Sequence, residues 1–264
     1  MTPRVRRLPA NDRGRDFVIG DLHGCLGDLQ EKLRAARFDP AAGDRLFSVG
    51  DLVDRGPDSL GCLALLRQPL FHAVLGNHEQ MMLDAMAEGV GDQSQAFLFH
   101  VFNGGGWAVD LIRSRAPHFL ALAERVVVLP HVLVVGEGPC RFHVVHAQLL
   151  ASLETGRQYL DRDIDSGNWG DEPNAAVRLT WSRVLANDGA WAGLDGVAAS
   201  YWPGLSLTYC GHNPVPRPAI VQSHYFVDTG AGYPGNVWVE SFDSGLPMRL
   251  TMLERLPDGG HRVW

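Results

Sequence analysis

Five segments of this chain share one pattern: a short apolar, β-branched run is followed at once by a residue that can bind a hard metal ion. The runs are FVIG, LFSVG, HAVLG, FHVV and LTYCG, and they lead to Asp21 with His23, Asp51, Asn77, His146 and His212. In an α/β domain the carboxyl ends of neighbouring strands meet at one crevice. We therefore expect two aspartates, one asparagine and three histidines to form one oxygen and nitrogen metal centre.

Composition limits the alternatives. The chain has 264 residues, 45% of them hydrophobic, which is consistent with a single large α/β domain. A formal charge of −7 argues against general nucleic-acid binding, which depends on Lys and Arg neutralising phosphates. No apolar run approaches the length of a membrane span. The four cysteines form no C-x-x-C pair, so we predict reduced thiols in a cytoplasmic protein.

The order of patterns predicts strands alternating with helices. Leucines 22, 26, 29 and 33 form one helical stripe, 58–67 forms a second, and a third helix begins near Asn77 and ends near Gly89. Such βαβ units imply parallel strands. We expect residues 1–15, with five arginines, to form a flexible arm and residues 16–264 to form a single domain. Within that domain we expect a loop-rich substrate or cap region over 150–207 and a hairpin over 224–243.

Each motif has a simpler interpretation when it stands alone. In D-L-H-G (21–24) the aspartate could merely pair with a nearby imidazole. In G-D-L-V-D-R-G (50–56) an ion pair between Asp54 and Arg55 could hold a turn. In G-N-H-E (76–79) Asn77 could be an N-cap residue, although that role does not explain His78 beside it. The recurrence of these motifs favours the metal site.

Other histidines and other phosphate chemistries can be judged from local pattern. On a strand, His143 and His146 point to opposite faces, so only His146 is available to the crevice. We assign no function to the histidines without a motif, which are His72, His100, His118, His131, His224 and His261. No G-x-x-x-x-G-K-[ST] loop is present, and Lys32 lies within a helical pattern, which excludes a P-loop nucleotidase.

Taken together, these motifs resemble those of the calcineurin-like metallophosphoesterases, in the bacterial and phage group of the phosphoprotein phosphatase branch. The resemblance extends to GNHEQMMLDAM (76–86), FNGGGW (102–107), WSR (181–183) and VDTGAGYPGN (227–236). It implies an αββα sandwich whose strands converge on a dinuclear metal site. Two positions depart from the family pattern: Gln148, where Asp or Gly is expected, and Asn213, where Thr is usual.

The resemblance also implies a role for each motif residue. One ion would be held by Asp21 and His23, the other by Asn77, His146 and His212, with Asp51 bridging the two. Such mixed ligands suit Mn²⁺ first, with Fe or Zn²⁺ as alternatives. Arg55 and Arg183 would bind the phosphate. His78 would protonate the leaving group, and Asp54 would orient His78.

The function that follows is a metal-dependent serine/threonine protein phosphatase that uses a metal-bridging hydroxide. One alternative is a dinucleoside-tetraphosphate hydrolase or small-molecule phosphatase of the same superfamily. The tetraphosphatase branch often lacks a counterpart of Asp54 and has Asp in place of Glu79, so both residues favour the protein phosphatase. The third alternative is a non-catalytic metal-binding scaffold, which should have lost a ligand or an arginine. We expect phosphorylated proteins or small phosphate esters as partners, and neither nucleic acid nor membrane.

Overall fold

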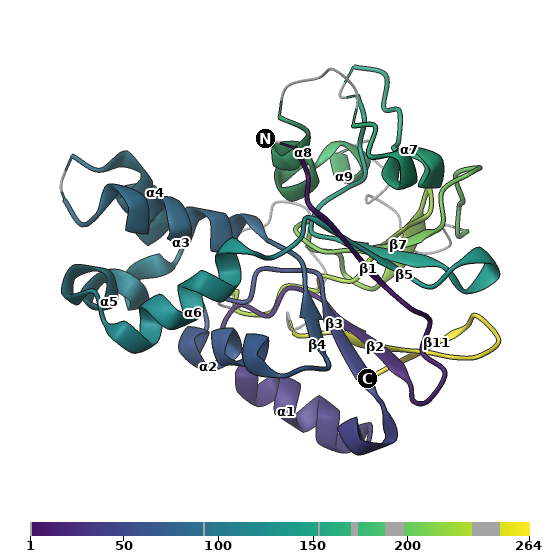
Figure 1. Cartoon of the computed structure of the whole chain (residues 1–264), viewed down its shortest axis with the longest axis horizontal. Coiled ribbons are helices and arrows are strands. Elements are labelled where there is room, and N and C mark those ends of the chain that lie inside the picture. Colours follow the sequence, from purple (N-terminus) through teal and green to yellow (C-terminus); the bar gives the residue numbers. More distant parts are fainter. Residues whose placement is uncertain (1, 92, 153, 170–173, 188–197, 234–248) are drawn as a thin grey trace.

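The computed structural model describes the chain except for residues 1, 92, 153, 170–173, 188–197 and 234–248. Its described strands form two sheets (Figure 1). The first runs in the order β1 (Val5–Leu8), β5 (Val132–Val135), β6 (Phe142–Val145), β7 (Leu207–Cys210), β9 (His224–Phe226) and β8 (Ala219–Val221). The second runs in the order β11 (His261–Val263), β10 (Met252–Arg255), β2 (Asp16–Ile19), β3 (Arg45–Ser48) and β4 (Phe71–Ala73).

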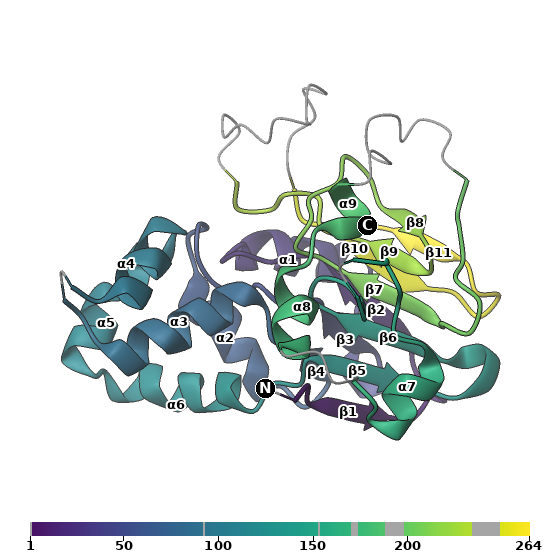
Figure 2. The same cartoon turned by 90° about the horizontal axis from the view of Figure 1, so that it is seen from above.

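Helices cover the outer sides of the two sheets (Figure 1), and one group of them extends beyond the sheets at one end of the molecule, on the left in Figure 2. On the side of the second sheet are α1 (Leu26–Ala35), α2 (Ser59–Ala64), α3 (Asn77–Glu88), α4 (Gln95–Phe102), α5 (Val109–Ser114) and α6 (Pro117–Val127). On the side of the first sheet are α7 (Asp161–Ser166), α8 (Ala175–Trp181) and α9 (Val184–Asn187). Short 3₁₀ helices occur at η1 (Pro40–Ala42), η2 (Leu65–Arg67), η3 (Gly105–Ala108) and η4 (Gly138–Cys140).

Alternating side chains along the strands hold these layers together. In β2, Phe17 and Ile19 pack with the helices of their own side, whereas Val18 packs against the other sheet. In β5, Val132 packs toward α7 and α8, whereas Leu133 joins Val18 between the sheets. Because successive side chains of a strand point to opposite faces, each sheet is buried on both sides. The predicted αββα sandwich is therefore confirmed.

The strands that lead to the first three motifs are parallel and adjacent. β2 pairs with β3, and β3 pairs with β4, in parallel register. The helix predicted from the leucine stripe begins at Leu26, so Leu22 lies in the loop before it. The segment 58–67 forms α2 and then η2, and the Asp58 side chain caps α2 by accepting a hydrogen bond from the Gly61 N–H. The third predicted helix is α3, which ends at Gly89. Parallel pairing brings the carboxyl ends of these strands to one edge of the sheet.

Residues 1–15, which the sequence predicts to be a flexible arm, include a strand. Residues 5–8 form β1, which pairs in parallel with β5 from Val5 opposite Val132 onward. Arginines of this segment also have partners: Arg4 donates to the Leu129 carbonyl, and Arg7 forms an ion pair of 2.8 Å with Asp165. A four-residue strand at the edge of a sheet needs no long apolar run, and its hydrogen-bond partners lie far along the chain. That residues 16–264 form one domain stays a prediction.

The region 150–207 contains more regular structure than a loop-rich cap implies. It includes α7, α8 and α9, and Leu150 forms an isolated antiparallel bridge with Gln158. The hairpin expected over 224–243 lies partly outside the described residues. Its first strand, β9, pairs antiparallel with β8, which precedes it in the chain. No helix in the described part of the chain is long and apolar enough to cross a membrane.

Candidate active site

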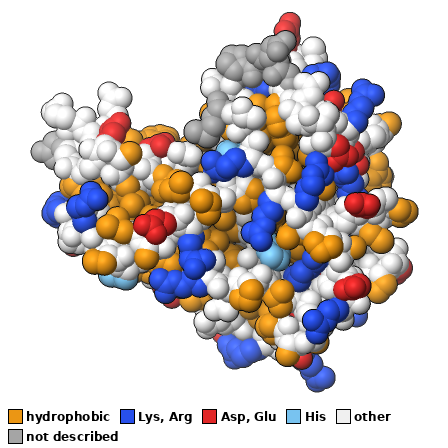
Figure 3. Space-filling model, in the orientation of Figure 1, with side chains coloured by type: hydrophobic (Ala, Val, Ile, Leu, Met, Phe, Trp, Pro, Cys, Tyr) orange, Lys and Arg blue, Asp and Glu red, His pale blue; other side chains and the backbone are white. Residues whose placement is uncertain are grey.

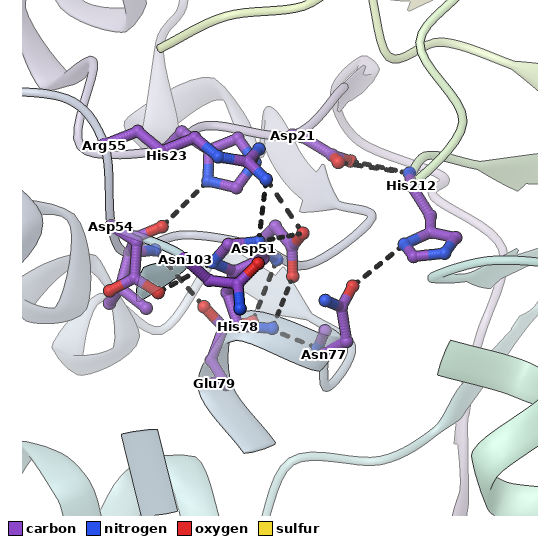
Figure 4. A network of polar contacts seen from close by, with 12 residues as sticks. Asp21, His23, Asp51, Asp54, Arg55, Asn77, His78, Glu79, Asn103 and His212 are labelled. Atoms are coloured by element: carbon purple, nitrogen blue, oxygen red, sulfur yellow. Dashed lines mark hydrogen bonds and ion pairs between the residues drawn. The ribbon is translucent and has the colours of Figure 1, made fainter. Parts of the chain in front are cut away.

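Residues that follow β2, β3, β4 and β7 converge at one place (Figure 4), and His146, which follows β6, joins them through a contact with Asn77. The His23 N–H donates to the Asp51 carbonyl at 2.8 Å, which joins the first loop to the second. The His212 N–H donates to the Asp21 carboxylate at 3.1 Å, although these residues are 191 positions apart. The structure therefore brings together all the residues for which the sequence predicted a metal-binding role: Asp21, His23, Asp51, Asn77, His146 and His212.

The Asn77 side chain faces histidines rather than capping a helix. Its Oδ1 lies 2.8 Å from His146 Nε2 and 2.9 Å from His212 Nδ1. Helix α3 begins at Asn77 itself, with Gly76 in the N-cap position. The alternative interpretation of Asn77 as an N-cap residue is therefore wrong, and its amide oxygen is oriented toward the cluster.

Two groups of buried side chains could each hold a metal ion, because their nitrogen and oxygen atoms lie within 4.8 Å of one another. The first group is His23, Asp51 and His78, and the second is Asp51, His146 and His212. Asp51 belongs to both groups. Its Oδ2 lies 3.7 Å from His23 Nε2, and its Oδ1 lies 3.4 Å from His146 Nε2. This carboxylate alone reaches toward both groups among the described residues.

The charge of the cluster fits a cation. Asp21, Asp51 and Asp228 are all buried here. Burial, together with the nearby Asp228 and Asp51, raises the pKa of Asp21 well above its ordinary value, although Arg55 partly opposes this. Carboxylates gathered in a buried site repel one another unless positive charge is supplied. A bound divalent ion would supply that charge.

The histidines of the cluster present the neutral imidazole that metals require. Burial lowers the pKa of His23 to about 3, lowers that of His146, and lowers that of His212 well below its usual value. All three rings are therefore uncharged near pH 7. His212 Nε2 is buried and has no hydrogen-bond partner among the described residues. This unpartnered nitrogen, with the carboxylates beside it, fits a divalent metal.

Several residues of the cluster have an unusual backbone conformation, and Glu79 holds the loop that contains Asp51. Five residues at the cluster that carry side chains have φ between 41° and 74°: His23, Asp51, Asp54, Arg55 and His212. Such left-handed conformations are costly for residues other than glycine and gather at functional sites. The Glu79 carboxylate accepts hydrogen bonds from the backbone N–H groups of Asp51 at 2.8 Å, Leu52 at 2.7 Å and Gly76 at 3.0 Å. These bonds hold the Asp51 loop against the start of α3.

Two arginines approach the cluster from different loops. The Arg55 guanidinium hydrogen-bonds to His23 Nε2 through Nη1 and lies 3.0 Å from His78 Nε2 through Nη2. Its central carbon also lies 4.2 Å from the centre of the Tyr233 ring. Arg183 Nη1 donates to the His212 carbonyl at 3.0 Å and is itself exposed to solvent. Both guanidinium groups therefore lie where an anion bound at the cluster could reach them.

His78 and Asp54 form a buried pair beside the cluster. His78 Nδ1 lies 2.7 Å from Asp54 Oδ2. Burial acts to raise the pKa of Asp54, but hydrogen bonds from His100 and His78 outweigh it and lower this pKa to about 2. Asp54 is therefore ionised, and it holds the proton of His78 on Nδ1.

The family is decided by a model of the calcineurin-like phosphoesterases, which matches residues 17–221. This chain belongs to the calcineurin-like phosphoesterases. The matched segment contains every residue of the cluster described above except Asp228 and Tyr233.

This phosphoesterase is similar to protein phosphatases and to dinucleoside tetraphosphatases. It is 37% identical to serine/threonine-protein phosphatase 1 of Salmonella typhimurium over 88% of this chain and 94% of the relative. It is 49% identical to a symmetrical bis(5'-nucleosyl)-tetraphosphatase of Dechloromonas aromatica, over only 28% of this chain and 26% of the relative. A solved structure assigned as a diadenosine tetraphosphatase has a TM-score of 0.60 and 25% identity, and covers 99% of this chain and 97% of its own.

Some residues around the site of this phosphoesterase have no role in the sequence analysis. His100 and Trp107 both contact Asp54, and Asp228 contacts Asp21. Trp107 and Asp228 lie in the FNGGGW and VDTGAGYPGN segments, whose resemblance to the family does not by itself indicate a role for either side chain. No motif around His100 indicates a role for it, although it lies two residues before the FNGGGW segment. His143, by contrast, faces away from the site and contacts Thr208 at 3.3 Å, as its strand position predicted.

Proposed function

We propose that this phosphoesterase is a metal-dependent phosphomonoesterase that removes phosphate from phosphoserine and phosphothreonine in proteins. The observation that carries the proposal is the placement of the Asp54–His78 pair. His78 Nε2 lies 3.8 Å from Oδ2 of Asp51, the carboxylate shared by the two possible metal groups. A proton donor therefore stands beside the place where ions would hold a phosphate. The similarity to a named serine/threonine-protein phosphatase over most of both chains supports the same activity.

We assign the metal ligands as the sequence predicted. Asp21 and His23 would hold one ion, Asn77, His146 and His212 would hold the other, and Asp51 would contribute to both sites. His78 is left out of the ligand set, because its Nδ1 is bonded to the carboxylate of Asp54, a pairing suited to the proton donor that we propose. The mixture of carboxylate, amide and imidazole donors favours Mn²⁺, with Fe or Zn²⁺ as alternatives. When bound, two such metal ions would supply a hydroxide nucleophile at neutral pH and neutralise charge on the phosphoryl oxygens.

The phosphate is bound by Arg55 and Arg183. A planar guanidinium can donate two parallel hydrogen bonds to phosphate oxygens, which a lysine cannot do. In the structure the N–H groups of Arg55 face ring nitrogens of His23 and His78, which are weak partners for a full positive charge. A bound phosphate dianion offers a better partner. The two arginines orient it with its ester oxygen toward His78.

His78 protonates the leaving oxygen. The oxygen of the attacking hydroxide bonds to phosphorus as the P–O ester bond breaks. The electron pair of the broken bond stays on the leaving oxygen, which takes the proton from Nε2 of His78. A serine or threonine alkoxide is a strong base and leaves slowly without this proton. Asp54 holds the ring in position through Nδ1 and stabilises the protonated form of His78.

A second candidate is hydrolysis of a dinucleoside tetraphosphate or another small phosphate compound. The solved structure assigned as a diadenosine tetraphosphatase favours it, because the likeness covers nearly the whole chain. In that reaction the leaving group is a nucleotide phosphate, which is already stable as an anion. The buried Asp54–His78 pair is better matched to an alkoxide. A cytoplasmic location, and the absence of nucleic-acid and membrane partners, stay predictions.

A substrate panel tests the assignment. Purified protein with added Mn²⁺ is assayed against phosphoserine and phosphothreonine peptides, phosphoproteins, diadenosine tetraphosphate and p-nitrophenyl phosphate. We expect the highest kcat/KM among physiological substrates on the phosphopeptides or phosphoproteins. A higher kcat/KM on diadenosine tetraphosphate would overturn the proposal in favour of the second candidate.

A further inference from the structure

Asp54 receives more hydrogen bonds than a simple partner of His78 requires. Its Oδ2 lies 2.7 Å from His78 Nδ1, and its Oδ1 lies 3.0 Å from His100 Nε2 and 2.7 Å from Trp107 Nε1. A carboxylate oxygen only accepts hydrogen bonds, so Nε2 of His100 carries the proton in this contact. Both oxygens of Asp54 are thus committed to N–H donors.

The fold makes a close-fitting space for the His100 ring. His100 lies on α4 and is fully buried. A Cβ atom added to Gly105 would lie 2.3 Å from His100 Nε2, far inside van der Waals contact. Gly105 begins η3, the short helix that contains Trp107. Glycine at position 105 therefore allows the ring and η3 to come together, so that the two donors reach Asp54 from adjoining elements.

His100 has no second polar anchor. Its Nδ1 is buried and has no hydrogen-bond partner among the described residues. Burying a polar atom without a partner costs about 1–3 kcal/mol. A histidine at position 100 is therefore unfavourable unless its other nitrogen, Nε2, gains a compensating contact, and that contact is the one with Asp54. Trp107 differs, because its ring also packs against Phe119 with centroids 5.8 Å apart. Packing explains Trp107 in part, but it does not explain an imidazole at position 100.

We propose that His100 is a positioning residue for proton transfer by His78, acting through Asp54. The inference rests on the proposed function, because it assumes that His78 protonates a leaving alkoxide. Two hydrogen bonds on Oδ1 hold the plane of the Asp54 carboxylate, and the fixed Oδ2 holds the Nδ1–H of His78. Nε2 of His78 is thereby kept near Arg55 Nη2, at 3.0 Å, and near Asp51 Oδ2, at 3.8 Å. A phosphate held by Arg55 would place its ester oxygen there.

Loss of this support should depend on the leaving group. An alkoxide needs the proton as it leaves, so small errors in the direction of the His78 N–H slow its release. A p-nitrophenolate is stable without the proton and should be almost indifferent. If His100 only fills space, replacing it should lower the activity on both substrates by the same factor.

The test compares three variants with the wild type, each loaded with Mn²⁺ and with its metal content measured. His100→Phe keeps a ring of similar size without a donor, and His100→Gln keeps an N–H donor. His143→Phe is the matched control, because His143 is also fully buried but contacts Thr208 away from the site. We expect His100→Phe to lose about 10–100-fold of kcat on a phosphoserine peptide, a part of the usual contribution of a general acid, and less than about threefold on p-nitrophenyl phosphate. His100→Gln should recover most of the loss, and His143→Phe should change both substrates equally.

His78→Asn separates this inference from the function on which it rests. A bias toward loss on the peptide in His78→Asn, with equal losses in His100→Phe, would overturn the role of His100 and leave the proposed function standing. No bias in His78→Asn would instead overturn the acid role of His78, and with it the inference. Proton NMR gives a readout without turnover: the wild type should show downfield N–H resonances from both rings bonded to Asp54. His100→Phe should remove one resonance and shift the other, and an unshifted His78 resonance would contradict the coupling.

Discussion

Asn213 holds both Arg183 and the residue before it. Its Oδ1 accepts a hydrogen bond from Arg183 Nη1 at 3.1 Å, and its Nδ2 donates to the Ser182 carbonyl at 3.1 Å. Gln148 holds the same segment from the other side, because its Oε1 accepts from Ser182 Oγ at 3.1 Å and from the Leu185 N–H at 3.2 Å. The two positions at which the sequence departs from the family pattern are therefore the ones that support an arginine proposed to bind phosphate.

Removing this support should weaken phosphate binding. Asn213→Ala should raise KM about 3–10-fold on every phosphate ester, because it deletes hydrogen bonds worth about 1 kcal/mol that preorganise Arg183. The ratio of activities on alkyl and aryl esters should not change. Steady-state kinetics with Asn11→Ala as control checks this, since Asn11 holds a turn near Gly43 and should affect only stability. An unchanged KM in Asn213→Ala would contradict the prediction.

Replacing Arg55 or Arg183 should lower activity more than replacing a residue that positions Arg183. Arg183→Ala and Arg55→Ala should each lower kcat/KM by about 10–100-fold, because charge-assisted bonds to phosphate are lost. Lysine at either position should restore the charge but not the two-pronged geometry, and so should recover only part of the activity. If Arg183→Ala behaves like the wild type, the proposed role of this residue is wrong.

Asp51 should be the most sensitive of the proposed ligands. It reaches toward both metal groups, so Asp51→Asn should weaken both sites, whereas His23→Asn should weaken one. Metal content measured after dialysis should fall further in Asp51→Asn, and activity should fall with it. Chelator-treated wild type should be inactive and should recover with Mn²⁺. Full activity in excess chelator, after verified removal of the metals, is incompatible with the proposal.

His78 should show its role through the choice of leaving group. His78→Asn should lose about 10²–10⁴-fold of kcat on a phosphoserine peptide and much less on p-nitrophenyl phosphate, with both metals still bound. Asp54→Asn should show the same bias more weakly, because it orients the ring without donating the proton. Equal losses on the two esters would mean that His78 positions phosphate or ligands instead.

Asp44 should make stability depend on pH. Its buried carboxylate accepts hydrogen bonds from the Arg15 N–H at 2.8 Å, Arg15 Nη2 at 2.6 Å and the Asp39 N–H at 2.9 Å. Burial opposes ionisation, but the hydrogen bonds from Arg15 and Asp39 outweigh it and lower the pKa of Asp44. A folded-state pKa below the unfolded value of about 3.9 stabilises the fold above that pH, and the stabilisation is lost as the pH falls through the folded-state pKa.

Denaturant unfolding of Asp44→Asn measures this contribution. The variant should be less stable than the wild type by about 1–3 kcal/mol at pH 7, and the difference should shrink as the pH is lowered below about 4. A matched variant is Asp110→Asn, whose carboxylate is 92% exposed and should show little change at either pH. A difference for Asp44→Asn that stays constant with pH would contradict the assignment of a lowered pKa.

The sequence by itself determined the site and the order of the central elements. Apolar runs that end at Asp21, Asp51 and Asn77, with leucine stripes between them, predict parallel strands whose ends meet, and the structure confirms this for β2, β3 and β4. Local sequence patterns were enough to predict these elements, because the alternation along a strand, the apolar stripe of a helix and the polar residues at a strand end each span only a few residues. The opposite orientations of His143 and His146 followed from the same periodicity.

Only the tertiary structure decided the partners that come from distant segments. β1 forms a strand because its backbone pairs with the edge of β5, although this segment contains no apolar run. His100 reaches Asp54 across 46 positions, and Asn213 reaches Arg183 across 30. A hydrogen bond depends on distance and direction between two atoms, and no local pattern in a sequence records how far apart remote side chains will lie. The residues proposed to bind the metals could therefore be predicted from the sequence, whereas the residues that position them could not.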